Sequence, residues 1–124
     1  MSGKQKILVV EDNPANLELF TDLLAMGGFE SIKTSQGEEA LELAKKESPD
    51  LVLLDIQLPG VDGVSVAKAL RENEATRHIK IIALTAYAMK GDRELFLQKG
   101  FDGYIPKPVT MKVFLEAING YLKE

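Results

Sequence analysis

The sequence contains no cysteine and only one histidine, His78, among its 124 residues. The absence of cysteine excludes disulfides and thiolate metal sites, and it fits a reducing compartment. A single histidine excludes His-rich metal centres and any chemistry that needs two imidazoles from one chain. We expect His78 to be a surface residue that precedes a strand.

Long apolar runs and an excess of positive charge are missing as well. No segment approaches the ~20 apolar residues of a membrane span, and the apolar stretch near the start is too short for a secretory signal. The net charge of −4 disfavours a nucleic-acid surface. The sequence therefore predicts a cytoplasmic protein without nucleic-acid or membrane partners, and its length is most simply that of one domain, residues 1–124.

Short apolar runs alternate with amphipathic segments along the whole chain. Apolar runs of four to six residues are too short for helices, and the β-branched residues among them favour buried strands. Strands alternating with helices predict an α/β fold, in which a parallel sheet is covered on both faces. The more polar second strand is expected at or near an edge. The predicted strands are 7–10, 29–34, 51–54, 79–84 and 103–105.

Helix start signals support this order of elements. Asn13 followed by Pro14 is typical of an N-cap and a first helical residue. Ser35 with Glu38 fits a capping box for the second helix, and Thr110 is the expected cap of the last helix. The third helix is predicted to start near residue 63, and the fourth to cover 93–99.

Polar residues follow four of the five predicted strands. Glu11 and Asp12 follow the first strand, Asp55 the third, Thr85 the fourth, and Lys107 lies just beyond the fifth. The carboxyl ends of parallel strands share one edge of a sheet, where ligands bind in open α/β folds. We therefore expect these side chains to converge in one crevice.

The chemistry of such a set is that of phosphoryl transfer. Carboxylates held close together repel one another, which raises their pKa values or demands a cation. Oxygen ligands without histidine or cysteine favour a hard cation, and Mg²⁺ fits best. An aspartate such as Asp55 can act as a nucleophile and form an aspartyl phosphate. Lys107 and Thr85 would then contact phosphoryl oxygens.

With these residues assembled, the chain resembles the receiver domains of two-component response regulators. The resemblance extends from Ile7 to about Leu122 and rests on four motifs, in order and each at a strand end: VVEDN, LLDIQLPGVDG, ALTAYA and YIPKP. The stretches VEDNPANLELF and ALTAYAMKGD resemble the sequences of DivK-type single-domain receivers and of receivers attached to hybrid histidine kinases.

The resemblance implies a flavodoxin-like (βα)5 fold with strand order 2-1-3-4-5. It implies that Asp55 accepts a phosphoryl group from a histidine kinase or a histidine phosphotransfer protein. Glu11, Asp12, Asp55 and the backbone carbonyl of Gln57 would surround Mg²⁺, with Glu11 acting through water. The bond between Lys107 and Pro108 is expected to be cis and to aim Lys107 into the site.

The resemblance also implies a switch. Thr85 would turn towards the phosphoryl group, Tyr104 would fill the vacated space, and the face of the fourth helix, fifth strand and fifth helix would change for a downstream partner. Ala15, Asn16 and Leu19 are further candidates for partner contact. The residues expected on the switching face are Lys90, Arg93, Tyr104, Val109 and Lys112.

Three alternatives compete with a signalling phosphoacceptor that assists only its own phosphorylation and dephosphorylation. A phosphatase of the haloacid-dehalogenase type also uses an aspartate nucleophile, but it usually has a second acid where this chain has Gln57. A flavodoxin-like cofactor binder would place a flavin phosphate against three acidic groups. A receiver-like scaffold that is never phosphorylated would not need the intact set of acids, hydroxyl and lysine.

Overall fold

The computed structural model describes residues 4–56, 63–85, 92–107 and 109–123. Within these ranges strands and helices alternate along the chain, as the sequence pattern predicts. The strands are β1 (Lys6–Val10), β2 (Glu30–Thr34), β3 (Leu51–Asp55), β4 (Lys80–Thr85) and β5 (Gly103–Pro106). The helices are α1 (Pro14–Met26), α2 (Gly37–Glu47), α3 (Gly63–Glu72), α4 (Asp92–Gln98) and α5 (Met111–Lys123).

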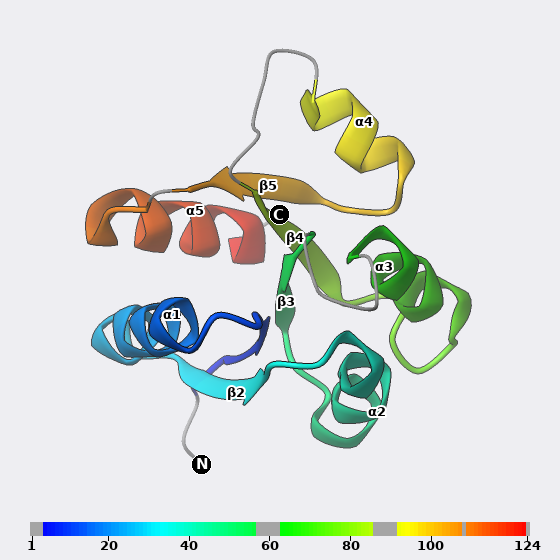
Figure 1. Ribbon diagram of the computed structural model, residues 1–124, viewed down its shortest axis with the longest axis horizontal. Helices are drawn as coiled ribbons and strands as arrows, with labels where there is room; N and C mark the ends of the chain where they lie inside the picture. The colour runs from blue at the N-terminus through cyan, green and yellow to red at the C-terminus, as the bar shows by residue number, and fades with distance from the viewer. Residues whose placement is uncertain (1–3, 57–62, 86–91, 108, 124) are drawn as a thin grey trace.

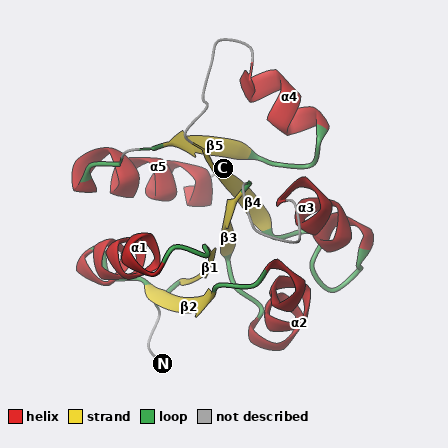
Figure 2. Ribbon diagram, viewed as in Figure 1, coloured by secondary structure: helices red, strands yellow, loops and turns green. Residues whose placement is uncertain are grey.

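The strands form one parallel sheet in the order β2-β1-β3-β4-β5, which confirms the predicted topology. Helices α1 and α5 cover one face of the sheet, and α2, α3 and α4 cover the other (Figure 1). The same three layers are visible when the chain is coloured by secondary structure (Figure 2). The polar strand β2 lies at an edge, as expected, and β5 forms the opposite edge.

The central strands are buried on both sides, because successive side chains point to opposite faces. In β1, Leu8 and Val10 pack towards α2 and α3, whereas Ile7 and Val9 pack towards α1 and α5. All five residues of β3 are buried. Each fully buried aliphatic side chain contributes roughly 1.5–3 kcal/mol to folding. The apolar layers therefore make β1, β3 and β4 rigid supports for whatever follows them.

Two of the predicted helix caps are present. The side chain of Asn13 accepts a hydrogen bond from the backbone N–H of Asn16 at 3.1 Å, with Pro14 in the first turn. The hydroxyl of Thr110 accepts a hydrogen bond from the backbone N–H of Val113 at 3.3 Å. These local signals correctly mark the starts of α1 and α5.

The predicted capping box of Ser35 and Glu38 is wrong. The N-cap of α2 is Gln36, which makes no capping hydrogen bond through its side chain. Thr34, the buried last residue of β2, bonds to the start of α2 instead of Ser35. Its hydroxyl accepts from the N–H of Gln36 at 3.1 Å and donates to Glu39 Oε1 at 2.6 Å.

No helix within the described ranges combines the length and the apolar character needed to span a bilayer. The longest, α1 and α5, have 13 residues each.

Gly63 lies where the start of α3 approaches the end of β3, and we predict that Gly63→Ala destabilises the protein. A Cβ at this position would lie 2.6 Å from the Cα of Ile56 and 2.8 Å from the carbonyl oxygen of Asp55, both of which are backbone atoms. Overpacking of this kind costs about 1–3 kcal/mol. Urea denaturation will measure the change in the free energy of unfolding.

The matched control is Gly120→Ala in α5, where an added Cβ meets nothing within 4 Å. Alanine is favoured over glycine inside a helix by roughly 0.5–1 kcal/mol, so the control will be neutral or stabilising. Equal effects of the two substitutions would contradict the close approach at Gly63.

Candidate functional site

Three carboxylates meet at the carboxyl edge of the sheet. Val10 pairs with Leu54 in the β1–β3 ladder, so the residues that follow them, Glu11 and Asp55, lie side by side. Oxygens of Glu11, Asp12 and Asp55 lie within 4.8 Å of one another. Glu11 and Asp55 are 0% and 5% exposed, whereas Asp12 is exposed. The cluster thus has a buried floor and one carboxylate that faces solvent.

Lys107 joins this cluster from the far edge of the sheet. Its ammonium nitrogen lies 3.2 Å from Glu11 Oε1 and 3.2 Å from Asp55 Oδ2. Its backbone N–H donates to the carbonyl oxygen of Thr85 at 2.8 Å, which fixes the chain directly after β5. Because β4 separates β5 from β3 in the sheet, the lysine side chain reaches past the end of β4. The Lys107 ammonium therefore forms ion pairs with two buried carboxylates.

Burial, above all, raises the pKa of Glu11 from its ordinary value of 4.5 to about 7. The neighbouring Asp55 carboxyl raises this pKa further, whereas the amide of Asn16 and the charge of Lys107 lower it. Asn16 Nδ2 donates to Glu11 Oε1 at 2.8 Å. Asn16 was a candidate for partner contact only; its contact with Glu11 is a feature that sequence analysis missed.

The donor set fits a small divalent cation. Glu11 Oε2 is buried and has no hydrogen-bond partner among the residues that the structure describes. A buried carboxylate oxygen without a partner is costly, and a bound cation removes that cost. The ligands offered are carboxylate oxygens, which Mg²⁺ prefers. The backbone carbonyl of Gln57 and the bond to Pro108 lie outside the described residues.

Thr85 and Tyr104 lie on adjacent strands near this edge. Thr85 is the last residue of β4 and is 1% exposed. Tyr104 is half-buried in β5, opposite Ala83, with its ring 5.6 Å from that of Phe96 in α4. The Tyr104 ring therefore makes a direct contact between β5 and α4.

The other residues of the predicted switching face are described in part. Val109 is half-buried and Lys112 is exposed at the start of α5. Arg93 belongs to α4. Lys90 lies outside the described residues. Arg93, Tyr104 and Lys112 thus come from the three elements that the prediction names, and Val109 lies in the connection between β5 and α5.

His78 is exposed in the connection between α3 and β4, as expected. It precedes β4 by two residues and so lies near the amino edge of the sheet, opposite Asp55. The structure therefore does not bring the only histidine of the sequence into the acidic cluster.

Comparison with known proteins gives a consistent result. Residues 7–119 match the response regulator receiver domain family. The polar-differentiation response regulator DivK of Brucella ovis is 49% identical over 118 residues, which cover 95% of this chain and 96% of the relative. This match bears out the predicted likeness to DivK-type receivers.

Two solved structures share the fold at more than 30% sequence identity. One is the receiver domain of the sensor histidine kinase PA1611 from Pseudomonas aeruginosa PAO1, with a magnesium ion coordinated in its active site cleft. Its TM-score is 0.89 and its sequence identity 34%, and the match covers 98% of this chain and 100% of the receiver chain. The other is the BeF3-activated N-terminal receiver domain of RstA from Klebsiella pneumoniae, with a TM-score of 0.86 and 32% identity over 97% of this chain and 100% of its own. Neither gives support to the phosphatase alternative.

The raised pKa of Glu11 predicts how stability depends on pH in protein kept free of divalent cations. The folded state holds a proton that the unfolded chain releases near pH 4.5, so the stability that Glu11 contributes is lost as the pH rises towards 7. Glu11→Gln does not titrate. The stability of the natural protein relative to Glu11→Gln will therefore fall by roughly 2 kcal/mol between pH 5 and pH 8, since one pKa unit corresponds to about 1.4 kcal/mol.

Denaturant melts at both pH values in the presence of a chelator measure this difference. Glu18→Gln, at an exposed position on α1, is the matched control and should leave the pH dependence unchanged. A difference between the natural protein and Glu11→Gln that stays constant with pH would rule out the assigned titration.

Proposed function

Because the chain belongs to the response regulator receiver domain family of two-component signalling, we propose that Asp55 is its phosphoacceptor. The observation that carries the proposal is the pair of 3.2 Å contacts that Lys107 makes with Asp55 and Glu11. They join an aspartate at the end of a buried strand to an ammonium that can bind a phosphoryl oxygen. Asp55 stands at the base of this cluster, with only 5% of its surface exposed.

The proposed reaction is transfer from a phosphohistidine of a histidine kinase or a histidine phosphotransfer protein. A carboxylate oxygen of Asp55 attacks phosphorus, a P–O bond forms, and the P–N bond to the imidazole breaks. The imidazole nitrogen keeps the electron pair. Lys107 holds the carboxylate before attack and then neutralises a transferred oxygen, and the hydroxyl of Thr85 donates to another.

Mg²⁺ would be held by Glu11, Asp12, Asp55 and the backbone carbonyl of Gln57, and there it would neutralise charge on the phosphoryl oxygens. The buried orphan oxygen of Glu11 and the exposed position of Asp12 support this assignment. Glu11 would act through a water molecule held by its Oε2, since its Oε1 already contacts Lys107 and Asn16. The magnesium ion in the cleft of the Pseudomonas receiver supports the same choice of cation.

Signalling would then follow from movement of Thr85 and Tyr104. When the Thr85 hydroxyl turns to the phosphoryl group, the Tyr104 ring can move into the space it leaves and change its contact with Phe96. That contact joins β5 to α4, so the face of α4, β5 and α5 changes for a downstream partner.

The proposal covers residues 1–124 as one cytoplasmic receiver domain whose only chemistry is its own phosphorylation and dephosphorylation. The enzyme and scaffold alternatives differ from it in measurable ways. Turnover of many equivalents of a phosphate ester would favour a phosphatase, and failure to form an aspartyl phosphate would favour a scaffold.

Asp55→Asn is predicted to abolish covalent labelling by radioactive acetyl phosphate in the presence of Mg²⁺, since the amide is a poor nucleophile. Removal of Mg²⁺ with a chelator should likewise abolish labelling of the natural protein. Asp22→Asn, at an exposed site on α1, is the matched control and should be labelled normally. Undiminished labelling of Asp55→Asn would sink the assignment.

Beryllofluoride with Mg²⁺, which mimics an aspartyl phosphate, is predicted to change the environment of the Tyr104 ring. NMR signals of tyrosine labelled on the ring report this change directly. The shift should disappear in Asp55→Asn and shrink in Thr85→Ala. If the Tyr104 signal responds fully in Thr85→Ala, the ring moves without help from the Thr85 hydroxyl, and the proposed coupling is refuted.

A further inference from the structure

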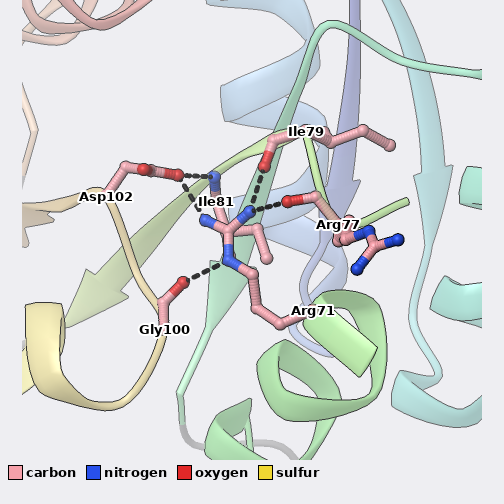
Figure 3. Close-up of polar contacts among 6 residues, drawn as sticks. All are labelled: Arg71, Arg77, Ile79, Ile81, Gly100 and Asp102. Atoms are coloured by element: carbon pink, nitrogen blue, oxygen red, sulfur yellow. Dashed lines mark hydrogen bonds and ion pairs between the residues drawn. The ribbon is translucent and has the colours of Figure 1, made fainter. Parts of the chain in front are cut away.

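A second polar cluster lies at the opposite, amino edge of the sheet. Arg71, in the last turn of α3, donates from Nη1 to the carbonyl oxygens of Arg77 and Ile79 at 2.7 Å and 2.8 Å. Its Nε donates to the carbonyl oxygen of Gly100 at 2.8 Å, and its Nη2 contacts the carboxylate of Asp102. Figure 3 shows the guanidinium at the centre of these groups. One side chain thus joins α3, the α3–β4 connection and the segment that leads into β5.

Asp102 fixes the start of β5 against β4. Its backbone N–H donates to the carbonyl oxygen of Ile81 at 2.7 Å, and its carboxylate accepts from the N–H of Ile81 at 2.8 Å. The same carboxylate oxygen meets Arg71, so one atom links the ladder to the guanidinium. The regular pairing of Ile82 with Gly103 begins at the next residue. Asp102 therefore sets the register in which β5 starts.

The register of β5 needs contacts of this kind because the strand is short and lies at an edge of the sheet. It has four residues and pairs with β4 alone. On one face the ring of Tyr121 fills the space beside Gly103, where an added Cβ would lie 2.3 Å from the hydroxyl oxygen. That contact opposes sliding from the α5 side. Arg71 and Asp102 supply the corresponding polar constraint from the α3 side.

The register of β5 determines where Lys107 lies, because this residue directly follows the strand. A slip of one residue moves it by about 3.3 Å and reverses the face to which its side chain points. Either change would break the 3.2 Å contacts with Glu11 and Asp55. Contacts at the amino end of β5 therefore affect the position of Lys107 in the acidic cluster beyond its carboxyl end.

We propose that Arg71 and Asp102 are positioning residues for Lys107, which they hold in the acidic cluster by fixing the register of β5 on β4. This inference rests on the proposed function, because it assigns the pair a part in phosphorylation of Asp55. Glu11, Asp12 and Asp55 follow β1 or end β3, whereas the hydrogen bonds of the pair go to β4, to the α3–β4 connection and to the segment before β5. The pair therefore acts on the lysine and leaves the cation ligands in place.

The test measures two quantities, the rate of labelling by acetyl phosphate at saturating Mg²⁺ and the dissociation constant for Mg²⁺ by calorimetry. Arg71→Ala and Asp102→Asn should each lower the labelling rate by about ten- to a hundredfold, since a misplacement of about 1 Å can cost on the order of 10²-fold in rate. Neither should weaken Mg²⁺ binding, because the ligands stay in place and loss of the Lys107 ammonium from Glu11 and Asp55 leaves more negative charge for the cation. Asp102→Asn retains an oxygen acceptor for the N–H of Ile81, so it carries the test if Arg71→Ala does not fold.

Arg77→Ala is the matched control. The side chain of Arg77 reaches Glu74, not the cluster, and Figure 3 shows its guanidinium directed away from Arg71. Its carbonyl oxygen, which Arg71 uses, is retained in the variant. The control should be labelled at the natural rate.

A double-mutant cycle with Lys107→Ala separates positioning from a general loss of structure. In the Lys107→Ala background, Arg71→Ala and Asp102→Asn should slow labelling by no more than about twofold, because the group they position is already gone. An equal reduction in both backgrounds, a parallel loss of Mg²⁺ affinity, or no effect at all would overturn the inference. If the natural protein is not labelled, or Asp55→Asn is labelled equally, the proposed function itself has failed.

Discussion

The site depends on one shared cation, the Lys107 ammonium between Glu11 and Asp55. Pairing of β1 with β3 forces these two carboxyl groups together in a place with almost no solvent. Two buried negative charges at this distance repel strongly, and one must be protonated or both must be neutralised. Lys107 supplies part of that neutralisation from within the chain, and the pKa of Glu11 is still raised to about 7. The remaining imbalance is what makes the cluster receptive to a divalent cation.

The placement of these residues at one edge of the sheet could be predicted because all five strands are parallel. Once Glu11, Asp55 and Thr85 were seen to lie at the ends of apolar runs, their convergence followed from the common direction of the strands. Local cap signals succeeded at Asn13, which acts within its own helix. They failed at Ser35, because the hydroxyl of Thr34 from the preceding strand bonds the start of α2 instead.

Other contacts carry no recognisable signal in the sequence. Asn16 could bond to many groups, and only the path of the chain after β1 brings it to Glu11. Arg71 and Asp102 are separated by 31 residues and belong to no motif that marks them as partners. Such pairs depend on the geometry of packing and on side-chain length. Residue spacing alone therefore cannot predict them.

The distance along the chain between the opposing charges has a consequence for synthesis on the ribosome. Glu11 is made 96 residues before Lys107, and Asp55 is made 52 residues before it. While the chain is nascent, β1 and β3 can pair and bring their acids together before the balancing ammonium has left the exit tunnel. Early pairing of the central strands is thus opposed by electrostatic repulsion until Lys107 has emerged, unless one carboxyl group takes up a proton or a dissolved cation binds between them.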